Sequence, residues 1–229
     1  YQANNDIEKV CANDPATSIA RYSDVKAIYP NLSTQLASFF KGLYSQDLLR
    51  LAALREKIGQ IDDHYDNFLE FNEMKKGGKC PFCGVEKIKG IFEKGREAYD
   101  HYLPKALYPF NSINFRNLVP VCHECNSTHK LSKDPVRTVT GIRRKIFYPY
   151  ASISQSIEIS IDLSKPDIAH LMPADVRITF GPSALNEEIE TWKDVYGIEG
   201  RYQAKCCSND GAKYWMEEVR THCDNYKVT

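Results

Sequence analysis

The chain has 229 residues, of which 42% are apolar and 26% are charged, a composition that is typical of folded globular proteins and excludes wholesale disorder. Its apolar runs are too short to cross a bilayer and its first residues do not resemble a signal peptide, so we expect a cytoplasmic protein without a membrane partner. The formal net charge is zero, because 30 basic residues balance 30 acidic ones.

The charges are unevenly distributed along the chain. Residues 75–150 contain 15 Lys and Arg against 6 Asp and Glu, whereas the remainder contains 15 against 24. A basic middle section can offer a local positive surface to a polyanion, even in a protein that is neutral as a whole. The same lysines would also suit a solvated surface, so charge alone leaves both interpretations open.

Residues 1–76 are predicted to be helical, and residues 36–43 hold a first amphipathic set of apolar side chains. A second set recurs at alternating steps of three and four, which places it on one face of a helix: Leu51, Leu54, Ile58, Ile61, Tyr65 and Phe68. These apolar faces could pack into a core of their own. They could equally form a docking surface for a protein partner or a second copy of the chain.

The stretch KKGGKCPFCG is predicted to end the helical region, because Gly77 and Gly78 are helix breakers. It also carries the first of two CxxC pairs, Cys80 with Cys83 and Cys122 with Cys125, which are separated by 38 residues. Without a secretory signal, such pairs indicate metal ligands rather than disulfides. Four thiolates complete a tetrahedral zinc site, so we expect a structural zinc ion with no open position for chemistry.

Between the two pairs, the sequence predicts a strand, a loop, a second strand and a helix. The first strand spans residues 97–101 and ends in Asp100 and His101, and the second spans residues 117–122. The helix is expected to begin near Asn126. A zinc clamp at both ends would fold this segment into a compact unit, although it has little apolar core of its own.

The last part of the chain is predicted to be α+β. Alternating apolar residues over 157–163 predict a half-buried strand, which could pair with a second strand over 176–180. Helices are expected over 184–197 and 211–223. The cysteines of this region could form a second metal site with His222, but their spacing favours buried thiols: Cys206, Cys207 and Cys223.

The run YDHYLPKALYPFNSINFRNLVPVCHECNSTHK, together with the preceding CxxC, resembles the HNH endonuclease family. The resemblance covers about residues 78–135 and is to the subgroup whose ββα-metal fold is clamped by two CxxC pairs. The form Asp-His-Tyr-Leu-Pro-Lys is similar to bacterial HNH proteins that accompany anti-phage ATPases, such as the Septu type. The resemblance implies an HNH nuclease domain at 77–150. Together with the patterns described above, it leads us to expect an α+β protein with a helical region at 1–76 and an α+β region at 151–229.

The resemblance also implies a role for each matching polar residue. His101 would be the general base that deprotonates a water molecule, which suits an imidazole that titrates near neutrality. Asp100 and Asn126 would hold a hydrated Mg²⁺ or Mn²⁺ through hard oxygen ligands. Asn117 would brace His101 or the loop. His129, three residues after Asn126, is a candidate for binding metal or phosphate.

The expected substrate is DNA, because a cluster of basic residues accompanies the predicted metal helix. Such residues contact phosphates without choosing a base sequence, and the candidates are Lys105, Arg116, Lys130, Lys133, Arg137, Arg143, Arg144 and Lys145. One alternative is a non-catalytic zinc module that binds nucleic acid or protein. Another is an effector that stays silent until an ATPase or other partner docks on the helical N-terminal region.

Overall fold

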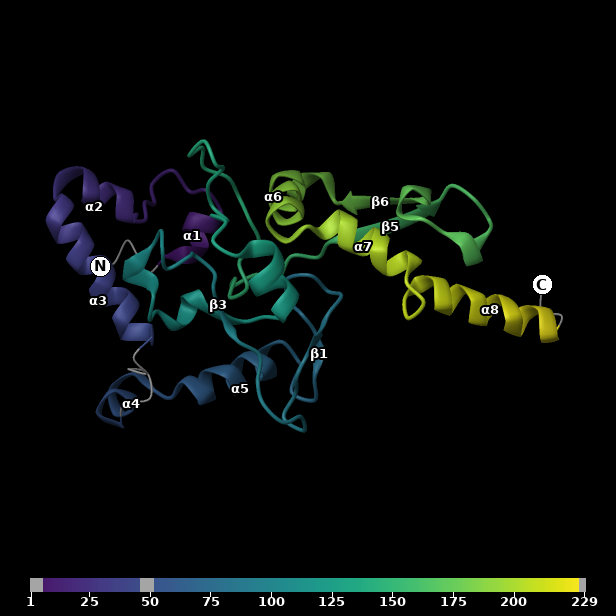
Figure 1. Ribbon diagram of the computed structural model, residues 1–229, viewed down its shortest axis with the longest axis horizontal. Helices are drawn as coiled ribbons and strands as arrows, with labels where there is room; N and C mark the ends of the chain where they lie inside the picture. Colours follow the sequence, from purple (N-terminus) through teal and green to yellow (C-terminus); the bar gives the residue numbers. More distant parts are fainter. Residues whose placement is uncertain (1–5, 46–51, 227–229) are drawn as a thin grey trace. The chain divides into compact units, whose positions relative to one another are not determined.

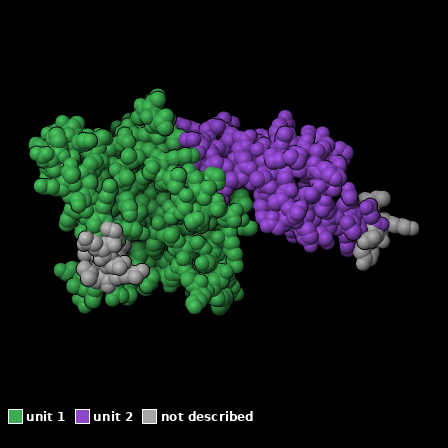
Figure 2. Space-filling model, in the orientation of Figure 1, with its two compact units in different colours: residues 1–154 green, residues 155–229 purple. Residues whose placement is uncertain are grey.

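The computed structural model describes residues 6–45 and 52–226. They form a mixed α+β protein that contains small two-stranded antiparallel sheets (Figure 1). The chain divides into two compact units, Tyr1–Ser154 and Gln155–Thr229 (Figure 2). The predicted helical region and the segment between the cysteine pairs therefore lie in the same unit.

Five helices precede the first cysteine pair in the described part of the chain: α1 (Ile7–Cys11), α2 (Tyr22–Ile28), α3 (Pro30–Ser45), α4 (Ala52–Ile58) and α5 (Ile61–Phe71). The prediction of one continuous helical face from Leu51 to Phe68 was wrong, and Leu51 itself lies outside the described residues. Gly59 separates α4 from α5 with a φ of +84°, a left-handed conformation that ends a right-handed helix. Helix α5 ends at Phe71, well before Gly77.

The apolar face of α5 packs inside the first unit. Tyr65, Phe68 and Leu69 are buried, and the Phe68 ring meets the Tyr150 ring edge-on with centroids 5.5 Å apart. His64 Nε2 lies 2.9 Å from the carbonyl oxygen of Leu118. The apolar face of α5 therefore packs into a core, which was one of the two interpretations that the sequence left open.

The strands near the cysteines are short. β1 (Gly78–Lys79) pairs with β2 (Lys87–Ile88), and β3 (Tyr99–His101) pairs with β4 (Leu118–Pro120). The second pair lies inside the ranges 97–101 and 117–122, so the prediction of these two strands is confirmed. Its register places His101 opposite Leu118.

The helix after the second cysteine pair is η5 (Glu124–Lys130), which begins two residues before the predicted start and is a π-helix. Its hydrogen bonds run from i to i+5, as in the 3.1 Å bond from the amide of Leu131 to the carbonyl oxygen of Asn126. Two 3₁₀ turns occupy the loop between β3 and β4, η3 (Pro109–Asn111) and η4 (Phe115–Asn117). Helices of the π type are frequent at functional sites.

In the second unit, β5 (Glu158–Leu163) pairs antiparallel with β6 (Val176–Gly181), as predicted. The prediction that β5 is half-buried was wrong, because Ile159 and Ile161 remain 38% and 46% exposed. The buried side of the pair belongs to β6, whose Val176 and Ile178 pack against Cys206.

Three α-helices complete the described part of the second unit: α6 (Asn186–Tyr196), α7 (Ile198–Cys207) and α8 (Ala212–Tyr226). The sequence predicted the first and last but not α7, which follows α6 directly at Gly197 and contacts β6. Short 3₁₀ turns lie at η6 (Ile168–His170), η7 (Pro173–Asp175) and η8 (Ser183–Leu185). None of the helices in the described ranges has both the length and the apolar character needed to span a bilayer.

Gly90 allows two backbone segments of the first unit to approach each other closely. A Cβ atom at this position would lie 2.2 Å from the amide nitrogen of Gly77 and 2.3 Å from the carbonyl carbon of Lys76. The neighbouring amide of Ile91 donates to the carbonyl oxygen of Lys75 at 3.0 Å, which holds the segments together. Glycine is therefore required by space at this position.

We expect Gly90→Ala to destabilise the first unit by about 1–3 kcal/mol, the usual cost of overpacking. Urea unfolding followed by circular dichroism and by metal release measures the change. As a control, Gly200→Ala lies within α7 and its Cβ would meet nothing within 4 Å, so it should stabilise the second unit by about 1 kcal/mol. Equal effects of the two substitutions would contradict this explanation.

Candidate metal centre

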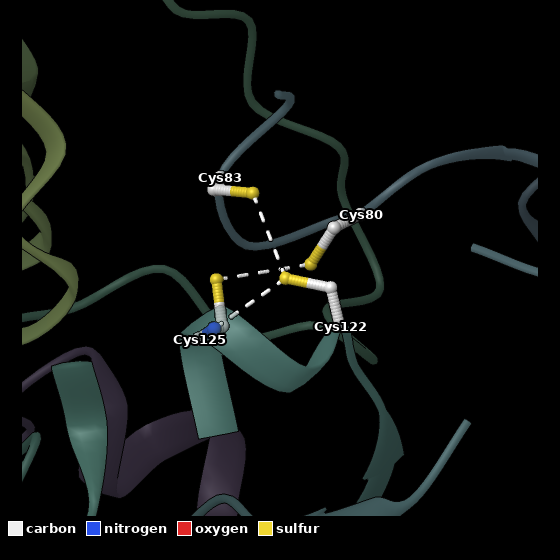
Figure 3. Close-up of side chains that lie close together, drawn as sticks. All are labelled: Cys80, Cys83, Cys122 and Cys125. Atoms are coloured by element: carbon white, nitrogen blue, oxygen red, sulfur yellow. Dashed lines mark hydrogen bonds between the residues drawn. The ribbon is translucent and has the colours of Figure 1, made fainter. Parts of the chain in front are cut away.

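The four cysteines of the two CxxC pairs converge on one buried point, as Figure 3 shows. All four sulfur atoms lie within 4.8 Å of one another, with 3.9 Å between Cys80 and Cys125 and 4.0 Å between Cys83 and Cys122. Sulfurs bound tetrahedrally to zinc at about 2.3 Å would lie roughly 3.8 Å apart. A disulfide needs about 2.05 Å, so these distances fit a shared metal ion.

The local backbone positions these sulfurs through tight turns. The amide of Gly84 donates to the carbonyl oxygen of Cys80 at 2.8 Å, and Gly84 has a φ of +65°. The amide of Glu86 donates to Cys83 Sγ at 3.5 Å, and the amide of Cys125 donates to Cys122 Sγ at 3.4 Å. Such outer contacts orient ligands and stabilise thiolates.

The electrostatics of the cluster suit a bound cation. Interactions with Cys122 raise the pKa of the Cys80 and Cys125 thiols, while interactions with neighbouring thiols lower the pKa of Cys83 and Cys122. Four thiols at this separation cannot all ionise by themselves, because like charges repel. A bound divalent cation removes this conflict, since metal coordination deprotonates thiols outright. The four cysteines could thus bind zinc.

Elsewhere in the described ranges, no other group of three or more potential ligands lies close enough to hold a metal ion. The cysteines of the second unit accordingly form no second centre among the described residues. Cys206 is a buried thiol, as predicted, and burial raises its pKa. The same prediction was wrong for Cys207 and Cys223, which are only half-buried.

Asp100 lies on β3 and is paired with η5. Its Oδ1 accepts a hydrogen bond from Lys130 Nζ at 2.9 Å, and the side chains of both residues are almost completely buried. Burial raises the pKa of Asp100, while the ammonium of Lys130 acts in the opposite direction. The second oxygen, Oδ2, is buried without a hydrogen-bond partner among the described residues.

His101, the next residue on β3, has different neighbours. Its Nε2 lies 2.9 Å from the carbonyl oxygen of Ser112, which can only accept, so Nε2 carries the proton and Nδ1 carries the lone pair. The ring meets the Tyr44 ring of α3 edge-on with centroids 4.4 Å apart. Burial lowers the pKa of His101 to about 4, so the imidazole is neutral at physiological pH.

Asn117 holds the loop between β3 and β4. Its Oδ1 accepts from the amide of Leu103 at 2.7 Å, and its Nδ2 donates to the carbonyl oxygens of Leu103 and Asn111 at 3.0 Å each. The side chain is fully buried. It therefore ties both ends of the loop that carries Ser112, the hydrogen-bond partner of His101.

Asn126 and His129 both lie on η5 and are half-buried. The contact between this helix and Asp100 comes from Lys130, the last residue of the helix, rather than from Asn126. Residues four apart lie on nearly the same side of a helix, so Asn126 is one turn from the Asp100–Lys130 pair. The assignment of Asn126 and His129 to a catalytic site stays a prediction.

The predicted phosphate contacts differ in their surroundings. Lys130 is fully buried, so the expectation that it reaches DNA phosphates does not fit this structure. Arg116 and Lys133 are exposed and Lys145 is half-buried, while the Lys105 ammonium lies 4.5 Å from the centroid of the Tyr44 ring. Three further guanidinium groups donate to backbone carbonyl oxygens at 2.9–3.0 Å: Arg137, Arg143 and Arg144.

Sequence reasoning missed two residues that contact this region. It grouped Lys130 with the phosphate contacts, because the local sequence does not tell whether a lysine on this helix faces solvent or Asp100. Tyr44 was not singled out, because nothing in the spacing of the N-terminal helices connects α3 with His101.

The chain matches no protein-family profile, and no solved structure gives a significant match. Among curated proteins, it is similar to protein ea31 of Escherichia phage lambda, with 40% identity over 78 residues, or 34% of this chain and 22% of the phage protein. It is also similar to Septu protein PtuB of Bacillus thuringiensis, with 45% identity over 61 residues, or 25% of this chain and 23% of PtuB. The matches thus span less than a quarter of each relative. The PtuB similarity and the four-cysteine cluster are consistent with an HNH protein of the Septu type.

We expect Cys122→Ser to lose the bound metal and to unfold the segment between the cysteine pairs, since a structural zinc site contributes about 10–16 kcal/mol of apparent binding energy in small domains. Elemental analysis of the pure protein and circular dichroism measure the two effects. Cys207→Ser is the matched control, because Cys207 lies outside the cluster and should leave metal content unchanged. Metal-free wild-type protein with a native spectrum would contradict the prediction.

Asn117→Ala should destabilise the first unit by about 2–4 kcal/mol. It removes three buried hydrogen bonds, each of which contributes about 1 kcal/mol, and leaves the amide of Leu103 without its acceptor. Urea denaturation measures the loss. Asn67→Ala changes the same residue type at an exposed position on α5 and should have an effect within about 0.5 kcal/mol.

Proposed function

We propose that this chain contains an HNH endonuclease that hydrolyses phosphodiester bonds in DNA with the help of a divalent cation. The observation that carries the proposal is the arrangement β3–loop–β4–η5, in which the four-cysteine cluster joins the start of η5 to the Cys80–Cys83 turn that precedes β3. This arrangement supports the proposal because it gathers Asp100, His101 and Asn117 in one buried neighbourhood. The fold of the resembling family, a ββα-metal module, has the same order of elements.

His101 suits the role of general base. The carbonyl oxygen of Ser112 holds the Nε2 proton and orients the ring, so Nδ1 is the nitrogen available to take a proton from water. Because the ring is neutral at physiological pH, it can act without first losing a proton. Asn117 supports this geometry by holding the backbone of Leu103 and of Asn111, the residue that directly precedes Ser112.

The donor set near Asp100 fits a hard divalent cation. Oδ2 of Asp100 is an unpaired carboxylate oxygen, and Asn126 would supply an amide oxygen from the adjacent helix. Oxygen ligands of this kind suit Mg²⁺ or Mn²⁺. When bound, such a cation neutralises charge that develops on the phosphate during hydrolysis.

We further propose that the protein acts in anti-phage defence together with a partner such as an ATPase. The similarity to Septu protein PtuB supports this proposal, although it covers a quarter of the chain. The exposed side chains of Arg116 and Lys133 would contact DNA phosphates. A partner that docks on the N-terminal helices would act next to the site, since Tyr44 of α3 contacts His101.

A second candidate function is a non-catalytic zinc module that binds nucleic acid or protein. Two observations favour it: the carboxylate of Asp100 is already paired with Lys130, and His101 is only 8% exposed. A catalytic site would need access for water and phosphate. Cleavage of DNA by the pure protein, or by the protein with its partner, separates the two candidates.

We expect His101→Ala to abolish Mg²⁺- or Mn²⁺-dependent nicking of supercoiled plasmid, with a loss of at least about 100-fold for removal of a general base. The zinc content should stay at the wild-type level, because His101 is not part of the four-cysteine cluster. The control is His123→Ala, an exposed position between two cysteines. Undiminished nicking by His101→Ala would overturn the assignment of the base.

A further inference from the structure

Lys130 is a fully buried lysine at the end of η5, with two hydrogen bonds into β3. Its ammonium donates to Asp100 Oδ1 at 2.9 Å and to the carbonyl oxygen of His101 at 2.8 Å. A lysine is almost never fully buried unless it is paired. A single side chain thus fixes both a carboxylate and the backbone of two neighbouring residues on β3.

The helix that carries Lys130 is anchored at both ends. Cys125, near its start, belongs to the four-cysteine cluster, and Lys130, its last residue, binds β3. Leu131 then leaves the helix with a φ of +51°, which turns the chain away. The four-cysteine cluster and the Asp100–Lys130 ion pair therefore both restrict the movement of η5 relative to Asp100.

The two oxygens of Asp100 are made unequal by this contact. Oδ1 receives the ammonium, whereas Oδ2 is buried and has no hydrogen-bond partner among the described residues. Leaving a buried acceptor unsatisfied is unfavourable, and such groups are rare in folded proteins. A carboxylate with one oxygen bonded to lysine and the other without a partner is the pattern expected where a cation binds the second oxygen.

We propose that Lys130 is a positioning residue of the nuclease site, which holds Asp100 by Oδ1 so that Oδ2 is presented to the divalent cation. This inference rests on the proposed function. It reassigns Lys130 from DNA binding to the support of a metal ligand. The ion pair need not contribute net stability, because the desolvation cost of two buried charges often cancels their attraction. Its effect is on the orientation of the carboxylate.

The test compares two lysines of the same segment. Lys130→Met removes the buried ammonium with little change in volume, and Lys133→Met removes an exposed ammonium three residues later. Both full-length variants are purified with their zinc content checked. Binding of Mn²⁺ is measured without DNA by isothermal titration, and binding of a DNA duplex is measured separately as a function of salt.

Lys130→Met should weaken Mn²⁺ binding by about 10–100-fold, the usual effect of removing a group that supports a metal ligand. Its DNA affinity and salt slope should stay at the wild-type values. Lys133→Met should show the reverse, with wild-type Mn²⁺ binding and a salt slope reduced by about one unit if it contacts a phosphate. The two lysines would then have separate roles.

Two outcomes would overturn the role of Lys130. Unchanged Mn²⁺ binding with a reduced salt slope would make Lys130 a phosphate contact. Tighter Mn²⁺ binding in Lys130→Met would mean that the ammonium competes with the cation, because like charges repel.

Lys130→Gln is the second variant, to be used if Lys130→Met does not fold. Its side-chain amide can still donate hydrogen bonds but carries no charge. Loss of zinc and of native structure in both variants would make the role of Lys130 purely structural and would reject the proposal. Failure of the nuclease proposal itself gives a different result, in which the wild-type protein neither binds Mn²⁺ nor nicks DNA. Wild-type binding and nicking with no effect of Lys130→Met would reject the role of Lys130 alone.

Discussion

The convergence of four sulfur atoms within 4.8 Å is the constraint on which the rest of the first unit depends. The strands between the two cysteine pairs contain two or three residues each, which is too few for a stable sheet on their own. A cation bound by the two pairs would close the loop between them and would lower the conformational entropy of the unfolded chain. The expectation that this segment has little apolar core was wrong, because Leu103, Leu118, Val119 and Val121 are buried in it.

Buried polar groups give this framework its specificity. Asn117 ties the loop after β3, and Lys130 ties η5 to the strand itself. Both side chains are buried away from water, so breaking any of their hydrogen bonds is unfavourable. Only one arrangement of the backbone allows all of these hydrogen bonds to form. Asp100 Oδ2 and Asn111 Nδ2 are exceptions in this part of the chain, and unsatisfied groups in a largely paired network are where function is to be sought.

The N-terminal helices are part of the same unit rather than a separate attachment. His64 of α5 reaches the backbone of β4, and Tyr44 of α3 lies against His101. Ser112, which orients His101, also donates through its hydroxyl to the carbonyl oxygen of Phe40 on α3 at 2.9 Å. Any change in the position of α3 would therefore alter the surroundings of the imidazole, which gives a protein partner of these helices a physical route to the site.

Local patterns in the sequence determined several features correctly: the ligand set of the cysteine cluster, both strands that flank the loop, and the pairing of β5 with β6. These features follow from short-range spacing, since CxxC geometry and strand alternation involve residues a few positions apart. The exposure of β5 and the π-helical form of η5 depended on what each element packs against, whereas the break at Gly59 is a local effect of its left-handed backbone. Tertiary structure alone decided that Lys130 turns inward to Asp100 and that Tyr44 covers His101, because a lysine or a tyrosine has the same local signature whether it faces solvent or a partner distant in sequence.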